Sequence, residues 1–549
     1  MGHADRVVQR QAGVGKRTVW ISILTLLSRI LGLVREVISA ALFGDASKVY
    51  DAFLFAWRIP NLFRRFLGEG ALATSLQTAL TAEDSTNGDQ AGGALFGATF
   101  ALLASLLAAL STVVILGIWL MPDRMPGTEF LWLGSEPQVV RELTIRLMPF
   151  VVFVCLTAAA GGALNVRGHY TMPAIGPVLL NGVWIGALLL IRWSAGNDPS
   201  VSLEAQLPLV RWLAGGVLMA GLVQLVVLLP AMRSCGLWGS SVPILRHSSA
   251  AWAGARGVLK RSLPLALGAA VYQVNVMIDG MMAQGLLPDG GQTVHYLANR
   301  VQQFPLALVA VAATTAVFPA LAALGQQRRL EDLRGLHDRT QRNVLFVALP
   351  ATFGLAALAL PVTSALFEHG NFEAQGIERM ANALRILAFA ILPAGAVGLV
   401  ARTYYSMGDF KTPVRMSCSM LLANVGLNFL FLRWLGMDAD GLALATTLSS
   451  FGNLFLLLPG LKRRLGLPPA LPGFPLAFTK MLIAAGLCGL AANLVSQVKL
   501  PGLAHSLHLL LAIGAGVGAY VLGSMLLKVP ECAHFAPRIH RVSAKFRRK

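Results

Sequence analysis

Arginine is unusually frequent in the first two hydrophobic segments of the chain. Charged side chains in such apolar segments are the residues of this sequence that could bind an ion or a charged ligand. Five arginines fall in these segments: Arg29, Arg35, Arg58, Arg64 and Arg65. If each faced lipid near mid-depth, insertion would cost roughly 2.5 to 3.5 kcal/mol per side chain and about 12 to 17 kcal/mol in all. We therefore expect them to line a water-filled interior. A cationic interior implies an anionic cargo, an anion path or paired structural charges.

The composition excludes a soluble multidomain protein. The chain has 549 residues, 55% of them hydrophobic and 13% charged, with a mean hydropathy of +0.64, whereas soluble domains contain about 25% charged residues. The formal net charge of +19 would suit nucleic acid, but in a multispan protein excess Lys and Arg usually mark cytoplasmic loops. We expect an integral membrane protein with no nucleic-acid partner.

Hydrophobic runs long enough to cross a bilayer recur along the whole sequence. A helical span needs roughly 20 residues, and fourteen candidates follow: 19–42, 52–80, 92–121, 143–165, 173–194, 208–232, 261–287, 294–324, 343–367, 382–406, 412–435, 440–461, 475–497 and 505–528. An even number of spans places both termini on one side. Alternate connections hold most of the Lys and Arg residues, so that side is predicted to be cytoplasmic.

An internal repeat predicts the architecture. The stretch "NVRGHYTMP" parallels "YSMGDFKTP", and "LLIRW" parallels "LFLRW", at an offset of 240 or 241 residues. A similar shift aligns Arg58 with Arg300. Six spans thus repeat as six more, as in transporters whose cargo site lies between two lobes. The expected fold class is an all-α polytopic membrane protein of 14 transmembrane helices, arranged as two six-helix repeat lobes plus two C-terminal helices.

The repeat divides the chain into six parts. They are a cytoplasmic N-terminal segment (1–18), an N-lobe (19–232), a cytoplasmic linker (233–260), a C-lobe (261–464), the last two spans (465–528) and a basic cytoplasmic tail (529–549). The last two spans fall outside the repeat. They either pack against the core without a further role or form a surface for something that the twelve-span core cannot accommodate alone.

The depth of each arginine in the first span bears on its role. Arg29 lies about ten residues, or about 15 Å, into the span, which is too deep to reach the membrane surface easily. Arg35 and Glu36 lie nearer the far side. For Arg35, an ion pair between helices is the alternative to a cargo contact.

The second span combines charges with a helix breaker. Arg58 precedes Pro60 by two residues, and a proline bends a helix or exposes backbone carbonyls to a cavity. Arg65 and Glu69 stand at i and i+4, so we expect them to neutralise each other, whereas Arg64 has no such local partner.

Arg300 occupies the position of the second lobe that matches Arg58. Opposed lobes would bring arginines from both sides toward one volume, and guanidinium groups bind phosphate oxygens bidentately, so a pyrophosphate is a suitable ligand. The intramembrane carboxylates are predicted to be ion-pair partners rather than proton carriers. They are Glu36, Asp51, Glu69 and Asp279.

Motifs of catalysis and of cofactor binding are not found. The sequence contains no HExxH, no GxSxG and no dinucleotide fingerprint, and "GVGKRT" near the start lacks the spacing of a phosphate loop. Its five cysteines are scattered without metal-ligand spacing and are interpreted as small core residues. We expect no enzyme activity, no cofactor and no metal, with transport powered by gradients or voltage.

The first two spans, "SRILGLVREVISAALFG" and "DAFLFAWRIPNLFRRFLGEGALATS", resemble the opening of the MurJ (MviN) family of lipid II flippases, in the multidrug/oligosaccharidyl-lipid/polysaccharide exporter superfamily. The likeness continues through "GGALNVRGHYTMPAIGPVLLN", "LFEHGNF" and "YYSMGDFKTPV" and so covers nearly the whole chain. It implies that spans 1–12 surround a central cationic cavity in the bacterial inner membrane. It also implies that spans 13 and 14 shape an apolar groove for a polyprenyl tail, which weakens the packing interpretation.

The resemblance implies roles for single residues as well. The positions that match cavity arginines engaging the pyrophosphate and sugar-peptide head group are Arg29, Arg35, Arg64 and Arg300. Ser28 and Asp51 also match family positions near the cavity or its gate. From their places in the first two spans, Glu36, Arg58 and Glu69 are predicted to support the same region. Two positions depart from the family pattern. Glu36 stands where aspartate is common, and Asn299 stands where a carboxylate often precedes the second-lobe arginine, which puts the local charge balance and any ion coupling through that carboxylate in question.

The function predicted in this way is flipping of lipid II, undecaprenyl-pyrophosphoryl-MurNAc-pentapeptide-GlcNAc, from the inner to the outer leaflet by alternating access. The expected partners are lipid II and membrane lipids, with cell-wall synthesis enzymes as further candidates. One alternative is a flippase for another polyprenyl-pyrophosphate-linked oligosaccharide. A cation-coupled drug exporter would need cavity carboxylates or aromatics, and a non-transporting scaffold would tolerate cavity mutations.

Overall fold

The computed structural model describes residues 3–65, 71–123, 133–195, 203–238, 248–310, 317–466, 473–498 and 505–532. Side chains are described in these ranges except at 3–19, 71, 195, 203, 263–272 and 310. The described residues form helices and turns without a β-strand. Glu69 and the basic tail from 533 onward therefore lie outside the described residues.

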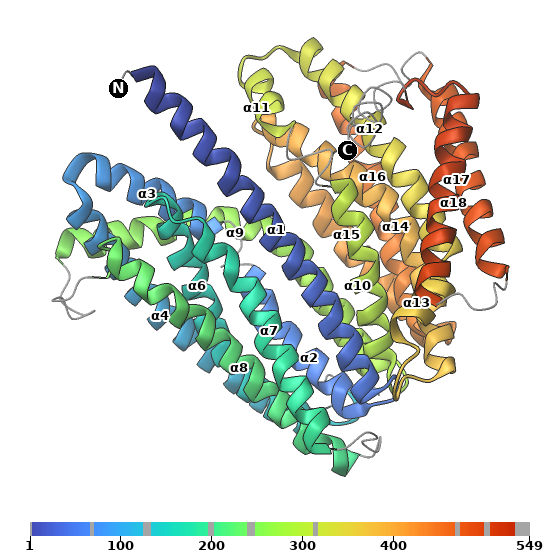
Figure 1. Cartoon of the computed structure of the whole chain (residues 1–549), viewed down its shortest axis with the longest axis horizontal. Helices are drawn as coiled ribbons and strands as arrows, with labels where there is room; N and C mark the ends of the chain where they lie inside the picture. Colours follow the sequence, from blue (N-terminus) through green and yellow to red (C-terminus); the bar gives the residue numbers. More distant parts are fainter. Residues whose placement is uncertain are drawn as a thin grey trace. The chain divides into compact units, whose positions relative to one another are not determined.

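The first of two compact units contains residues 1–292 and 370–372. Its helices are drawn in blue to green in Figure 1: α1 (His3–Phe43), α2 (Lys48–Phe63), α3 (Ala71–Asn87), α4 (Asp89–Leu120), α5 (Pro137–Leu147), α6 (Pro149–Val166), α7 (Thr171–Ala195), α8 (Leu203–Ser234) and α9 (Ser249–Leu286). Within this unit α1 packs on α7, and α9 packs on α2, α3 and α4.

The second unit contains residues 293–369 and 373–549. Its elements are α10 (Gly291–Ala310, which begins at the unit boundary), α11 (Phe318–Gln326), α12 (Leu330–Ala357), α13 (Ala359–Phe367), α14 (Ala374–Ser406), α15 (Lys411–Phe429), the π-helical turn η3 (Leu430–Trp434), α16 (Ala439–Leu465), α17 (Phe474–Gln497) and α18 (His505–Leu526). In Figure 1 the red helices α17 and α18 lie side by side, and they pack on each other. Compactness and sequence repetition are different criteria, so the predicted lobe boundaries remain a prediction.

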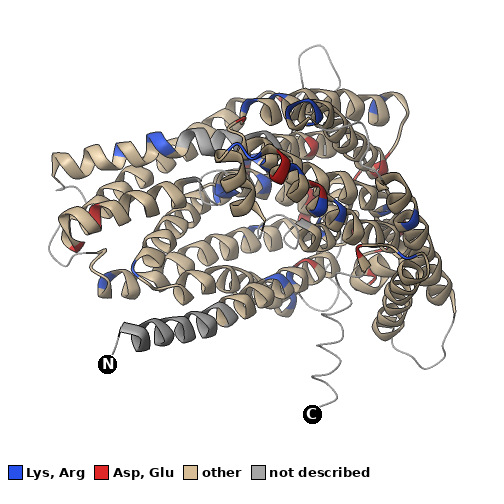
Figure 2. Cartoon of the chain, turned by 90° about the horizontal axis from the view of Figure 1, so that it is seen from above, with Lys and Arg blue, Asp and Glu red and all other residues tan. Residues whose placement is uncertain are grey.

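The all-α prediction is confirmed, because every predicted span coincides with at least one helix. Figure 2 shows the long uncharged stretches that such helices need. In the part of the chain that the structure describes, nine helices are long and apolar enough to cross a membrane, or ten if α12 and α13 form one broken span. The count of fourteen is not confirmed. The charges themselves contribute to this shortfall, since α1 contains Arg29, Arg35 and Glu36 within eight residues.

Two prolines in these helices have different surroundings: Pro361 follows a sharp bend, and Pro60 lies within a continuous helix. The axis bends by 68° between α12 and α13. Pro361 lies four residues after Ala357, where α12 ends, and its ring excludes the helical carbonyl at that position. Pro60, which was predicted to bend the second span or to expose backbone carbonyls to a cavity, lies inside α2, which continues to Phe63.

One turn in each unit shows the predicted repeat in the backbone. Gly168 follows α6 with a φ of 82°, and Gly408 follows α14 with a φ of 78°. In both turns the next N–H donates to the carbonyl five residues earlier, at 2.8 Å in the first unit and 3.0 Å in the second. A left-handed glycine with this bond is a common helix end. The sequences "RGHYTMP" and "MGDFKTP" therefore fold alike.

The two turns are tied to their units by different ion pairs. In the second unit Asp409 Oδ1 accepts a hydrogen bond from the Thr412 N–H at 3.0 Å, and Arg464 lies 2.7 Å from the other carboxylate oxygen. Burial opposes ionisation, but the bonds from Thr412 and the Arg464 charge outweigh it and hold the pKa of Asp409 below its ordinary value. In the first unit Arg167 beside Gly168 pairs with Asp84 at 2.8 Å.

Tyrosines anchor the core of the second unit. Tyr404 on α14 is fully buried, and its hydroxyl donates to the carbonyl of Leu457 on α16 at 2.9 Å. Tyr520 on α18 donates to the carbonyl of Phe346 on α12 at 2.7 Å. Each hydroxyl satisfies its donor inside an otherwise apolar cluster, which fixes the helix positions as well as burying area.

We expect Gly168→Ala and Gly408→Ala to destabilise the protein by about 1 to 2 kcal/mol each, because a Cβ disfavours the left-handed conformation of both turns. The measurement is the midpoint of thermal unfolding of the purified protein in detergent.

The matched control is Gly426→Ala, in the interior of α15, where φ is ordinary and a Cβ would meet nothing within 4 Å. Alanine there should leave the midpoint unchanged or raise it. Equal effects at all three glycines would contradict the conformational explanation.

Candidate functional site

Arg29 is an exposed cation on α1. It has no hydrogen bond or ion pair with any described residue. The adjacent Ser28 is half-buried, and its carbonyl accepts a hydrogen bond from Asn181 Nδ2 on α7 at 2.9 Å. Among the described side chains nothing neutralises the Arg29 guanidinium, while the backbone that carries it is held in place.

Arg35, six residues further along α1, has the opposite surroundings. The residue is 4% exposed. One terminal nitrogen pairs with Glu36, the other donates to Asn181 Oδ1 at 3.2 Å, and the guanidinium lies over the Trp184 ring, 4.2 Å from the centroid. This ion pair joins adjacent residues of α1, whereas the alternative considered for Arg35 was an ion pair between helices. Glu36 is an ion-pair partner, as predicted for it.

Asn181 joins the two arginine positions. Its amide nitrogen donates a hydrogen bond to the Ser28 carbonyl, and its amide oxygen accepts one from Arg35. One side chain on α7 therefore fixes α1 at two points about two turns apart, with Arg29 beside one of them. Sequence reasoning did not single out Asn181. The available signal was an amide within the apolar run 173–194, since a buried amide must find partners.

An aromatic cluster supports the same region from α2, α6 and α7. Trp184 meets Trp57 edge-on at 4.9 Å between ring centroids and Phe53 at 5.9 Å. Trp57 continues the cluster to Phe150 on α6 at 5.0 Å. These rings are almost fully buried, so they shield the guanidinium of Arg35 from water and position α2 against α7.

Arg58 links α2 to α9. Its Nη1 donates to the carbonyl of Val276 at 3.1 Å. Gly280, one turn further on α9, leaves the room that the arginine needs, because a Cβ there would lie 2.7 Å from Arg58 Cδ. This close approach accounts for a glycine at that point of an otherwise continuous helix.

Arg64 directly follows α2 and donates through Nε to Asn61 Oδ1 at 3.0 Å. Arg65 beside it is half-buried. The predicted pairing of Arg65 with Glu69 lies outside the described residues.

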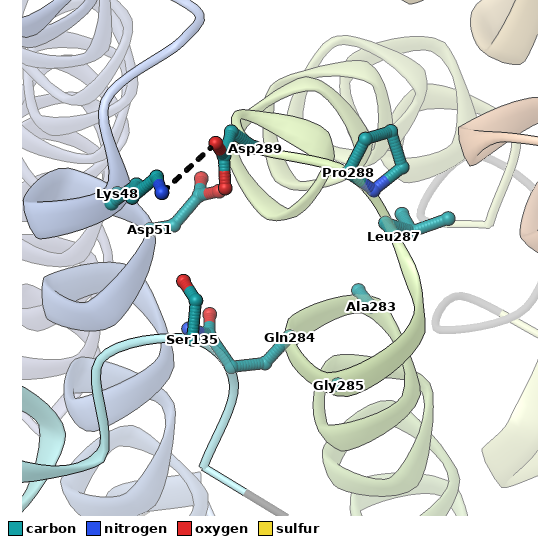
Figure 3. Close-up of a pocket in the computed structure, with 9 residues that line it drawn as sticks. All are labelled: Lys48, Asp51, Ser135, Ala283, Gln284, Gly285, Leu287, Pro288 and Asp289. Atoms are coloured by element: carbon teal, nitrogen blue, oxygen red, sulfur yellow. Dashed lines mark ion pairs between the residues drawn. The ribbon is translucent and has the colours of Figure 1, made fainter. Parts of the chain in front are cut away.

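Asp51 lies in the first turn of α2 and is 6% exposed. Its Oδ2 accepts a hydrogen bond from the N–H of Gly290, just after α9, at 2.8 Å. Beside it a polar cavity of about 90 Å³ opens, which Figure 3 shows with its lining residues. Another predicted carboxylate, Asp279 on α9, accepts a hydrogen bond from Asn275 at 3.1 Å.

Arg300 lies on α10 in the second unit and is half-buried, with Nη1 at 3.5 Å from Gln303 Oε1. The preceding Asn299 is engaged by His295, whose Nε2 lies 2.9 Å and whose carbonyl oxygen lies 3.2 Å from the amide nitrogen. The residue at position 299 thus supplies no charge to Arg300. The convergence of Arg29, Arg64 and Arg300 on one volume remains a prediction.

Among the described residues, no three His, Cys, Asp or Glu side chains gather in a way that would hold a metal ion. All five cysteines are free. Cys155 and Cys488 are buried, as expected of small core residues, but Cys418 is exposed, so that interpretation is wrong for Cys418. The reason is that α15 is the least buried of the candidate spans.

Comparison with known proteins identifies the family to which the sequence is related. The model of the family described as "Lipid II flippase MurJ" matches residues 39–513. The lipid II flippase MurJ of Burkholderia cenocepacia is 31% identical over 85% of this chain and 87% of its own length. The probable lipid II flippase MurJ of Vibrio cholerae is 30% identical over 81% and 82% of the two chains.

Two solved structures show the fold. A lipid II flippase MurJ in an inward closed conformation is similar with a TM-score of 0.72 at 20% identity, covering 92% of this chain and 98% of its own. An inward-facing multidrug resistance MATE family transporter of the MOP superfamily is similar with a TM-score of 0.63 at 12% identity, covering 82% and 98%. At these identities the likeness extends to the fold alone.

The apolar helices and these relatives together identify a multi-pass protein of the bacterial inner membrane. Since the family model matches most of the sequence, the conclusion about relationship does not depend on any single arginine. The chain belongs to the lipid II flippase MurJ family.

Proposed function

We propose that this protein moves lipid II from the cytoplasmic to the outer leaflet of the inner membrane, for peptidoglycan synthesis, by alternating access. The observation that carries the proposal is the match to the MurJ family over residues 39–513. The cargo would be undecaprenyl-pyrophosphoryl-MurNAc-pentapeptide-GlcNAc. The protein would act as a transporter without chemical change of its cargo.

The physical task is to carry a charged, hydrated head group across hydrocarbon. Transfer of an unpaired ion into such a medium is prohibitive. Guanidinium groups in a water-filled cavity replace lost hydration with bidentate hydrogen bonds to phosphate oxygens. Arg29 suits this role because no described residue neutralises it. We assign the same role to Arg64 and Arg300.

Arg35 was also expected to bind cargo, but its buried contacts with Glu36, Asn181 and Trp184 favour a supporting role. We propose that it stabilises α1 from inside the first unit. Asn181 then acts as a positioning residue, because it couples Arg35 to the backbone that carries Arg29.

The polyprenyl tail has to remain in an apolar environment while the head group crosses. We assign this task to α17 and α18, whose outward surfaces include Leu490 at 55% and Leu510 at 63% exposure. Both termini are proposed to be cytoplasmic on the basis of the loop charges.

A cation-coupled drug exporter is the rival that the MATE-like fold raises. Such an exporter needs carboxylates or aromatics facing a cationic drug. In the described part of the first unit Glu36 is paired with Arg35, and the aromatic cluster around Trp184 is buried. An anionic cargo fits these surroundings better. A flippase for another polyprenyl-pyrophosphate oligosaccharide shares the chemistry, so rescue specificity between cargoes distinguishes it.

Arg29→Ala and Arg300→Ala should abolish growth of cells depleted of their own flippase, because each removes a proposed phosphate contact. A leaflet-accessibility assay for lipid II should show at least about a tenfold loss of flipping, the equivalent of one charge-assisted hydrogen bond. Arg65→Ala should be milder.

The control is Arg192→Ala, which removes an exposed arginine in the last turn of α7. It should complement normally at equal expression. Normal complementation by Arg29→Ala or Arg300→Ala would count decisively against their cargo role.

Asn181→Ala should weaken lipid II binding and flipping, because α1 loses both contacts that hold the Arg29 region. Asn181→Asp keeps the acceptor for Arg35 but not the donor to Ser28, so it should be intermediate. The readout is lipid II affinity of the purified protein alongside its thermal midpoint.

Asn382→Ala is the matched control, since it removes an Asn–Arg hydrogen bond with Arg385 on an exposed surface. It should change neither quantity. If Asn181→Ala lowers the thermal midpoint without changing affinity, the residue is structural and its positioning role is refuted.

Membrane voltage, negative inside, should favour outward movement of the anionic head group. At about 2.3 kcal/mol per charge per 100 mV, two charges that cross most of the field would gain several kcal/mol. Collapse of the voltage by an ionophore should slow flipping in cells or vesicles. An unchanged rate would remove voltage as the driving force while leaving the cargo assignment intact.

A further inference from the structure

The polar cavity at the start of α2 is built from three separate segments of the first unit. Lys48 and Asp51 come from α2, Ser135 from the connection before α5, and Gln284 and Asp289 from the end of α9 and the residues after it. Figure 3 shows these polar side chains gathered around one opening, with Gln284 reaching from its helix toward Ser135. The volume of about 90 Å³ holds an ion with a few waters.

Gln284 is the unusual member of this set. It is 9% exposed, and its Oε1 has no hydrogen-bond donor among the described residues. A buried carbonyl oxygen without a donor is destabilising unless something else fills the place. Gly134, with a φ of 73°, makes room for the side chain, because a Cβ there would lie 2.5 Å from Gln284 Nε2. The carboxamide is thus held at the cavity wall.

The other polar side chains of the lining contribute mainly oxygen atoms. Asp51 and Asp289 supply carboxylates, and Ser135 supplies a hydroxyl. One Asp51 oxygen accepts the Gly290 N–H, which fixes the carboxylate in place. Among the described lining residues the one cation is Lys48, whose Nζ lies 3.3 Å from Asp289 Oδ2. Both side chains of that ion pair are about half exposed, at 44% and 51%, and exposed pairs of this kind are weak and exchangeable.

We propose that this cavity binds a divalent cation, with Ca²⁺ as the best fit, and that the ion displaces Lys48 from Asp289. Asp51, Asp289 and Gln284 Oε1 would be the protein ligands, with Ser135 and water completing the shell. Ca²⁺ accepts six to eight oxygens in irregular geometry, whereas Mg²⁺ demands a near-ideal octahedron. The lining residues that the structure describes include no His or Cys, which argues against a softer metal.

The affinity should be modest, because only two of the ligands carry charge and a lysine competes for one of them. Sites of this kind have dissociation constants on the order of 0.1 to 1 mM. Such a cation would join the start of α2 to the end of α9. The proposal concerns binding alone and does not depend on the nature of the transported cargo.

The test is a Ca²⁺ titration of the full-length protein in detergent after treatment with a chelator. We expect a saturable rise in the thermal midpoint with half-saturation near 1 mM, a smaller rise with Mg²⁺, and none with NaCl at matched ionic strength. Calorimetric titration gives the dissociation constant directly.

Three variants are expected to change the Ca²⁺ affinity in different directions. Asp289→Asn should weaken Ca²⁺ binding about tenfold or more, because it removes a charged ligand. Gln284→Glu should strengthen it by about the same factor, because it adds one. Lys48→Met should also strengthen it by removing the competing ammonium, an effect that loss of folding cannot imitate.

The matched control is Asp123→Asn, an exposed carboxylate of the same unit that pairs with Arg141 at 2.6 Å. It should leave the dissociation constant unchanged. The proposal is overturned if Ca²⁺ acts no more strongly than NaCl, or if Asp123→Asn and Asp289→Asn weaken binding equally, since surface screening then explains the effect. Either result would leave the lipid II proposal untouched.

Discussion

The placement of guanidinium groups in apolar helices is the constraint on which this structure depends. An arginine inside a membrane must be paired, hydrogen-bonded or solvated. α1 contains a buried and an exposed arginine six residues apart. Arg35 is buried against Glu36, Asn181 and Trp184, while Arg29 is exposed and no described residue neutralises it. One arginine thus contributes to the architecture of the first unit, and the other is the one that we propose to bind an anion.

The packing of the first unit explains why Arg35 is buried and how the backbone near Arg29 is held. Asn181 bonds to α1 on both sides of Arg29, and the rings of Trp57 and Trp184 close off the buried side. The Arg58 contact with Val276 ties α2 to α9, and the Asp51 contact with Gly290 ties it to the turn that follows α9. A charged helix becomes stable because neighbouring helices supply polar groups at the depths where they are required.

The repeat preserved backbone geometry more closely than it preserved side-chain chemistry. Gly168 and Gly408 form equivalent turns, yet Arg167 ties the first and Asp409 ties the second, with the charges reversed. The left-handed glycine is required by sterics, whereas any complementary ion pair can hold the turn. Asn299 shows the same freedom in the second unit, where His295 rather than a cation engages it.

Local composition determined the helical class, the segments that form helices, the repeat and the importance of the arginines, because hydrophobic length and charge in apolar runs act over short distances along the chain. The tertiary structure alone decided which arginine is buried and which is exposed. It also decided that α2 runs through Pro60 and that α12 bends before α13. Asn181 and Gln284 escaped prediction for the same reason. The groups that can hydrogen-bond to a buried amide lie on other segments of the chain. A single sequence does not reveal which of these distant groups will be its neighbours.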